Sequence, residues 1–146
     1  MHPFRKLNVW RKAHELALRI YRATSGMSGS TYPGLPAQIR RAAQSIPSNI
    51  REGAGRDTSR QFAYHLEIAI GSARELDYLI LLAHDLGAIP PSEYQRLAAR
   101  VDQVCAMAVS LRKRIIGPKP RPETKPRHSN SRSLPSPVAR HPSRPS

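Results

Sequence analysis

Apolar residues recur every three or four positions along most of the first 117 residues, which is the spacing of one helix face. The first stripe predicts a helix from about Leu7 to Thr24, and the second predicts one from about Leu35 to Glu52. A third stripe runs from residue 58 to residue 86, and a fourth follows Pro90-Pro91 and ends before Gly117. No segment shows the strict alternation of a half-buried strand, so the pattern predicts an all-α fold.

The ends of these segments carry helix start and stop signals. Thr58 and Gln61 have the spacing of a capping box, in which the Thr58 hydroxyl accepts a hydrogen bond from the Gln61 amide. Gly87 suits a left-handed C-cap at the end of the third helix. Pro47 lies inside the second helix, where it removes a backbone hydrogen bond, so we expect a kink there.

The loop between the third and fourth helices has only about four residues, so these helices must pack antiparallel. Together the four segments predict an antiparallel up-down four-helix bundle over residues 1–117. The third helix also has apolar residues outside its core stripe, which indicates association with another subunit. These residues are Ile68, Leu79, Leu81 and Leu82.

Residues 118–146 differ in composition from the rest of the chain. They hold 8 of the 14 prolines, and their other apolar side chains are Leu134, Val138 and Ala139. Such a segment buries too little apolar surface to offset the entropy cost of ordering. We therefore expect a disordered C-terminal tail, with seven Lys/Arg against Glu123 and a net charge of +6.

The whole chain is strongly basic, with 24 Lys and Arg against 10 Asp and Glu and a net charge of +14 with neutral histidines. A charge of this sign favours anionic partners such as nucleic acid. The one cysteine, Cys105, excludes an intrachain disulfide and a cysteine-rich zinc site. No apolar stretch approaches the ~20 residues that span a bilayer, and the start does not resemble a secretory signal, so we expect a cytoplasmic protein without a membrane partner.

The titratable residues form no recognisable catalytic or metal-binding motif. Neighbours such as His14-Glu15 and His84-Asp85 lack the spacing that places two metal ligands on one helix face. Cys105 lies beside the apolar stripe of the fourth helix, which favours a buried, inert thiol. Gly53-Ala54-Gly55 follows a helix and is not followed by the Gly-Lys-Ser/Thr of a phosphate loop. We therefore expect no enzyme activity, no metal and no cofactor.

Four arginines near the second helix are candidate nucleic-acid contacts. Arg40 and Arg51 fall within about 20° of each other around the helix axis, and Arg56 and Arg60 flank the following turn. Such a cluster can bind phosphate, pair with acids across a subunit interface, or remain solvated. No aromatic residue is interleaved with it in the sequence, so any nucleic-acid contact is expected to be electrostatic. Secondary contacts are expected from four tail residues: Lys119, Arg121, Lys125 and Arg127.

The segment from Gln38 to Gly53 reads QIRRAAQSIPSNIREG and closely resembles the signature of the 23S ribosomal RNA intervening-sequence protein family. Residues 4–13 are similar to the opening of that family, and residues 62–76 are similar to its third helix. Pro90-Pro91 departs from the pattern, because relatives usually begin the fourth helix with Ser and acidic residues. The signature residues are interpreted as structural: Ser45, Ile46, Pro47, Ser48, Asn49, Glu52 and Gly53.

The resemblance implies a bundle that assembles into a homopentameric ring. Some family members are encoded within insertions in ribosomal RNA genes, and a related branch comprises the accessory proteins of diversity-generating retroelements, which bind a reverse transcriptase and nucleic acid. No enzymatic activity is established for the family. We therefore expect a non-catalytic oligomeric scaffold that binds RNA or another nucleic acid, with a ribonucleoprotein or a reverse transcriptase as partner. The alternative is a protein-interaction adaptor that docks an acidic partner without binding nucleic acid.

Overall fold

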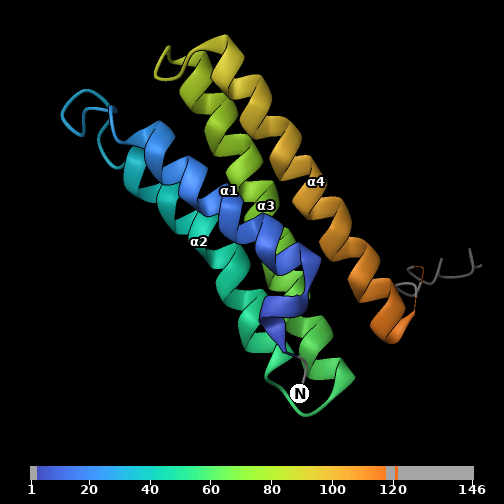
Figure 1. Ribbon diagram of the computed structural model, residues 1–146. Coiled ribbons are helices and arrows are strands. Elements are labelled where there is room, and N and C mark those ends of the chain that lie inside the picture. The colour runs from blue at the N-terminus through green and yellow to red at the C-terminus, as the bar shows by residue number, and fades with distance from the viewer. Residues whose placement is uncertain (1–2, 118–120, 122–146) are drawn as a thin grey trace, which may run out of the picture.

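The fold comes from a computed structural model, which describes residues 3–117 and residue 121. Within these residues the chain forms a short 3-10 helix, η1 (Phe4–Lys6), and four α-helices, with no strand. The helices are α1 (Asn8–Thr24), α2 (Leu35–Ala54), α3 (Ser59–Asp85) and α4 (Pro91–Ile116). Successive helices run in opposite directions, as the hydrophobic periodicity predicts, and form an up-down four-helix bundle (Figure 1).

All four helices contribute their apolar stripe to one continuous core. Burying a side chain such as Leu or Ile is worth about 1.5–3 kcal/mol, so these stripes supply the main driving force for folding. The largest fully buried side chains are Leu16, Ile20, Ile39, Ile46, Ile50, Leu66, Leu76, Ile80, Leu97, Val101 and Val104.

The helix ends follow the local signals closely. The Thr58 hydroxyl accepts from the Gln61 amide at 3.2 Å, and Gly87 has a φ of +76°, so both predicted caps are confirmed. The second helix continues through Pro47 and ends at Ala54, two residues beyond its predicted end at Glu52. The fourth helix begins at Pro91 without a side-chain cap. The departure at Pro90-Pro91 therefore changes a helix end and leaves the fold intact.

The expectation that Leu79 lies outside the core is wrong. This side chain is only 6% exposed and packs within the bundle, because α3 contacts both α2 and α4. A helix between two neighbours buries a wider arc than a single stripe. Of the four residues that indicated association, Ile68 and Leu81 stay exposed, and Leu82 is half-buried.

The bundle has two ends with different connections. At one end α1 and α3 begin and α2 and α4 finish, and at the other end lie the loops that join α1 to α2 and α3 to α4 (Figure 1). We divide the described bundle at the helix midpoints. The basic half comprises residues 3–16, 45–71 and 104–117, and the distal half comprises residues 17–44 and 72–103.

Candidate nucleic-acid interface

Positive charge is concentrated in the basic half of the bundle. This half has ten Lys and Arg against four Asp and Glu, a net charge of +6, whereas the distal half has seven against five, a net charge of +2. The C-terminal segment follows the end of α4 in the basic half and adds another +6. Lysine and arginine grouped in this way can neutralise several phosphates of one nucleic acid at once.

The turn between α2 and α3 presents two of the predicted arginines. Arg56 donates to the Glu52 carboxylate at 2.6 Å, and both side chains are about half exposed. Arg60 lies in the first turn of α3 and is exposed. Among the residues that the structure describes, Arg60 forms no ion pair, so its guanidinium is available to an external anion.

Arg51 joins this surface through an aromatic contact that the sequence did not indicate. Its guanidinium lies 5.4 Å from the centre of the Phe4 ring, and Arg5 lies 5.7 Å from the same ring. Phe4 also makes an edge contact with Trp10, with ring centres 4.9 Å apart. The cluster therefore has aromatic neighbours after all, because η1 folds back across the end of α2.

Arg40 does not belong to this surface. It lies in the distal half, where its Nε donates to the Thr24 hydroxyl at 2.8 Å and its guanidinium covers the Tyr21 ring at 5.4 Å. Arg40 is half-buried, so these contacts tie α2 to α1. Arg40 and Arg51 are about 16 Å apart along the helix at ~1.5 Å per residue, too far to act as one local cluster.

The family-like signature lies where α2 packs against α3. The Ser45 and Ser72 hydroxyls are hydrogen-bonded across the two helices at 2.8 Å, and the Asn49 amide donates to the Ser45 carbonyl at 2.8 Å. The Asn49 oxygen lies 3.4 Å from Nδ1 of His65 on α3. Ile46, Pro47 and Gly53 are buried, while Ser48 and Glu52 are exposed. Ser45 and Asn49 therefore join α2 to α3 through polar contacts, whereas Ser48 and Glu52 form no hydrogen bond with the described residues of α3.

Gly53 permits this close approach. A Cβ at this position would lie 2.8 Å from the Cβ of His65 and 2.8 Å from Cδ2 of Phe62. Such distances are below normal van der Waals contact, so any larger residue forces the helices apart or the Phe62 ring to move. The spacing of α2 and α3 beneath the basic turn therefore depends on a missing side chain.

The predicted tail contacts fall mostly outside the described residues. Lys119, Lys125 and Arg127 lie outside the described residues. The prediction that residues 118–146 are disordered also falls outside the described residues, except at residue 121. Arg121 is exposed and lies outside any helix.

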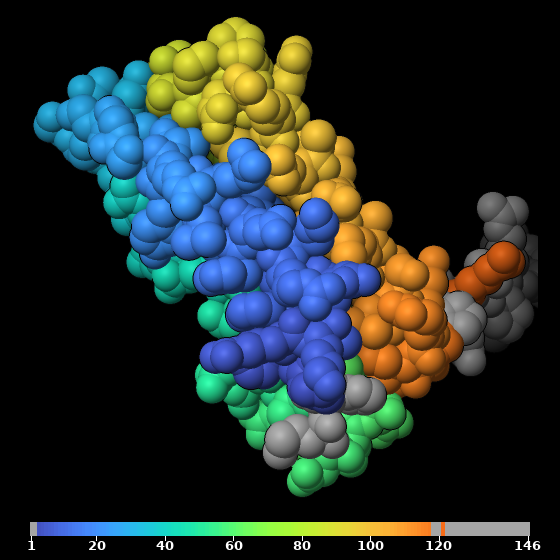
Figure 2. Space-filling model, viewed as in Figure 1, coloured from blue at the N-terminus to red at the C-terminus, as the bar shows by residue number. Residues whose placement is uncertain are grey.

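Sequence reasoning missed six further exposed or half-exposed cations in the basic half. They come from two segments, η1 with the start of α1 and the end of α4, which antiparallel packing brings beside the α2–α3 turn. Figure 2 shows these two segments side by side on one face. Placing charges on the predicted up-down topology would have found them. They are Arg5, Lys6, Arg11, Lys12, Lys113 and Arg114. Arg112 is less available, because it pairs with Glu67 of α3 at 2.6 Å and its side chain is 11% exposed.

The described residues contain no helix apolar and long enough to cross a bilayer. Within residues 3–117 and 121, no three His, Cys, Asp or Glu side chains gather as a ligand set for a metal ion. Cys105 is half-buried on α4.

Comparisons with known proteins find a matching family model and a similar solved structure. Residues 5–110 match the family model described as 23S rRNA-intervening sequence protein. A solved structure of a protein with unknown function from the S23 ribosomal protein family of Bacteroides thetaiotaomicron is 25% identical, with a TM-score of 0.68. The match covers 72% of this chain and 98% of that chain. A search of curated proteins finds no match. The family match spans most of the bundle, and the chain therefore belongs to the 23S rRNA-intervening sequence protein family.

Proposed function

We propose that the protein is a non-catalytic, homo-oligomeric scaffold that binds RNA or another nucleic acid through the basic half of its bundle and its basic C-terminal segment. The observation that carries this proposal is the uneven charge, +6 on the basic half against +2 on the distal half. A cytoplasmic ribonucleoprotein, or a reverse transcriptase with its RNA, is the partner that the family resemblance suggests.

Self-association would multiply this charge. A homopentamer, proposed from the family resemblance, would bring five bundles of +8 and five C-terminal segments of +6 into one particle. The exposed Tyr64, Ile68 and Tyr78 lie within about 80° of each other on α3, which gives another copy an apolar stripe to pack against. Light scattering on the purified protein tests this part of the proposal, and a monomer would refute it.

Salt-dependent RNA binding tests the nucleic-acid part. We would measure the fluorescence anisotropy of a fluorescein-labelled RNA hairpin and of labelled polyuridine with the full chain at increasing salt. Arg56→Glu/Arg60→Glu should weaken binding at least about tenfold and make the salt dependence shallower by about two phosphate contacts. The matched control is Arg19→Glu/Arg22→Glu, two exposed arginines of the distal half, which should change affinity by less than about twofold.

The outcomes separate the alternatives. If Arg56→Glu/Arg60→Glu keeps its oligomeric state and binds RNA as the unmodified chain does, the α2–α3 turn is not the contact surface. If the unmodified chain binds none of the nucleic acids in a salt-sensitive way, the scaffold proposal fails and a protein-interaction adaptor becomes the better account.

A further inference from the structure

A groove lies between the start of α1 and the end of α4, separate from the α2–α3 turn. It has a volume of about 480 Å³ and is lined on one side by residues 6–9 and on the other by five residues of α4 between Ala106 and Arg114. The core beneath remains closed, because Val9, Val104 and Ala108 are buried. The groove is therefore a surface feature where these two helices leave their apolar edges uncovered.

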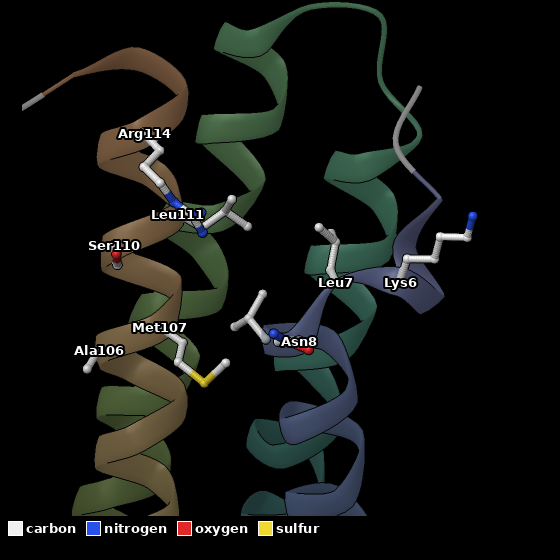
Figure 3. A pocket seen from close by; sticks show the side chains of 9 residues that line it. Lys6, Leu7, Asn8, Ala106, Met107, Ser110, Leu111 and Arg114 are labelled. Carbon is white, nitrogen blue, oxygen red and sulfur yellow. The ribbon is translucent and has the colours of Figure 1, made fainter.

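The floor of the groove is apolar and contains no aromatic side chain. Leu7, Met107 and Leu111 are half-buried. Figure 3 shows Met107 and Leu111 pointing from α4 toward the α1 side, where Leu7 lies just before the helix. Methionine adapts readily to the shape of an apolar partner. Nucleic-acid bases bind best to aromatic stacking platforms, so a floor of this kind suits aliphatic side chains better than bases.

The rim of the groove is basic. Arg114 points along α4 toward Leu111, and Lys6 stands on the α1 side with its amino group turned away from α4 (Figure 3). Both are exposed, and neither forms an ion pair with another described residue. No Asp or Glu lines the groove. A matching ligand therefore carries negative charge beside its apolar side chains.

The length of the groove matches about two turns of helix. Ala106 and Arg114 are about 12 Å apart along α4 at ~1.5 Å per residue. A docked amphipathic helix places apolar anchors at positions i, i+3 or i+4, and i+7, which span nearly the same distance. The chain's own C-terminal segment is a poor match, because its +6 charge would meet a basic rim.

We propose that the α1–α4 groove is a docking site for an acidic amphipathic helix of a partner protein, with Leu7, Met107 and Leu111 taking the apolar anchors and Arg114 meeting a carboxylate. The groove lies within the basic half and shares Lys6 and Arg114 with the cations of the candidate nucleic-acid interface, but it is separate from the α2–α3 turn that presents Arg56 and Arg60. A partner helix in the groove would leave that turn accessible to nucleic acid.

The test uses the full chain with selectively ¹³C-methyl-labelled methionine and a synthetic helical peptide of about 14 residues, with Leu at the anchor spacing and Glu on both flanks. The Met107 methyl lies in the groove, whereas Met27 lies in the α1–α2 loop of the distal half and is an internal control. We expect the peptide to shift the Met107 methyl resonance and leave that of Met27 unchanged. A Met107 resonance that does not respond overturns the proposal, because the peptide then does not occupy the groove.

Variants of the rim distinguish the kind of ligand. Arg114→Glu should weaken binding of the Glu peptide at least about tenfold and improve binding of a matched peptide with Lys in place of Glu. Arg96→Glu, an exposed position near the start of the same helix, should change neither. The proposal fails if the Lys peptide binds the unmodified chain as well as the Glu peptide does. It also fails if polyuridine shifts the Met107 methyl as strongly as the peptide, since the groove would then belong to the nucleic-acid surface.

Discussion

The basic half and the distal half of the bundle share one core but have different surfaces. Both contribute fully buried Leu, Ile and Val, yet five of the eight exposed large apolar side chains lie in the distal half. The charge is distributed in the opposite way, with +6 on the basic half and +2 on the distal half. One end of the molecule is therefore suited to anions, and the other exposes more apolar surface.

The difference arises more from the cations than from the carboxylates. The basic half has ten Lys and Arg where the distal half has seven, and it has four Asp and Glu where the distal half has five. An exposed ion pair is worth at most about 1 kcal/mol, so leaving the excess cations unpaired costs the fold little. Surface charge can thus be concentrated at one end without weakening the core.

Removing the C-terminal segment should have the largest effect on this comparison. A chain that ends at Gly117 loses +6 beside the basic half and keeps every core residue. We expect RNA affinity at low salt to fall on the order of tenfold to a hundredfold, because fewer counterions are released. Anisotropy titrations measure the loss, and thermal unfolding should give an unchanged Tm. An unchanged affinity would assign all binding to the bundle.

Gly53→Ala should destabilise the basic half from within. The added Cβ would meet Phe62 and His65 at 2.8 Å, and overpacking of this kind costs about 1–3 kcal/mol. Gly71→Ala is the matched control, since a Cβ there has no neighbour within 4 Å and removes the helix penalty of glycine, about 0.5–1 kcal/mol. Urea unfolding should show opposite signs for the two variants. Equal effects would mean that the α2–α3 approach is not tight at Gly53.

Arg40→Ala should separate structural from binding arginines. Losing the hydrogen bond to the Thr24 hydroxyl is expected to lower the free energy of unfolding by about 1–2 kcal/mol, because the bond involves a half-buried charged donor. RNA affinity should change by less than about twofold, in contrast to Arg56→Glu/Arg60→Glu. A large loss of RNA binding with normal stability would extend the contact surface into the distal half.

The smallest effect is expected at the ion pair between Arg112 and Glu67. Its 2.6 Å contact joins α4 to α3, but the Glu67 side chain is 43% exposed to solvent. A double-mutant cycle with Arg112→Gln and Glu67→Gln should therefore give a coupling energy of about 0.5–1 kcal/mol, reduced by salt. A coupling energy near zero would mean that apolar packing alone holds this end of α4 against α3.

Local patterns predicted the helices well but predicted the contacts between them poorly. The hydrophobic periodicity, the N-cap at Thr58 and the left-handed turn at Gly87 each depend on residues close together in the sequence. The sequence alone therefore predicts them. Arg40 and Arg51 have similar helical angles, yet one meets Thr24 and Tyr21 while the other meets Phe4. The partners of Arg40 lie on α1, and the partner of Arg51 lies in η1. The positions of residues around α2 alone do not predict which other segments they contact. The α1–α4 groove was missed for the same reason, because neither helix alone defines it.

The arrangement of the chain has a practical consequence for labelling and fusion. The first described residues and Gly117 both lie at the basic end, so an affinity tag or fluorescent protein joined at either place would crowd the surface under test (Figure 1). The loop between α1 and α2 is at the opposite end, and Gly26 and Gly29 within it have open space around them. Exposed loops with small residues tolerate insertions best. A reporter or surface-attachment sequence placed in this loop would leave the basic end facing its ligands.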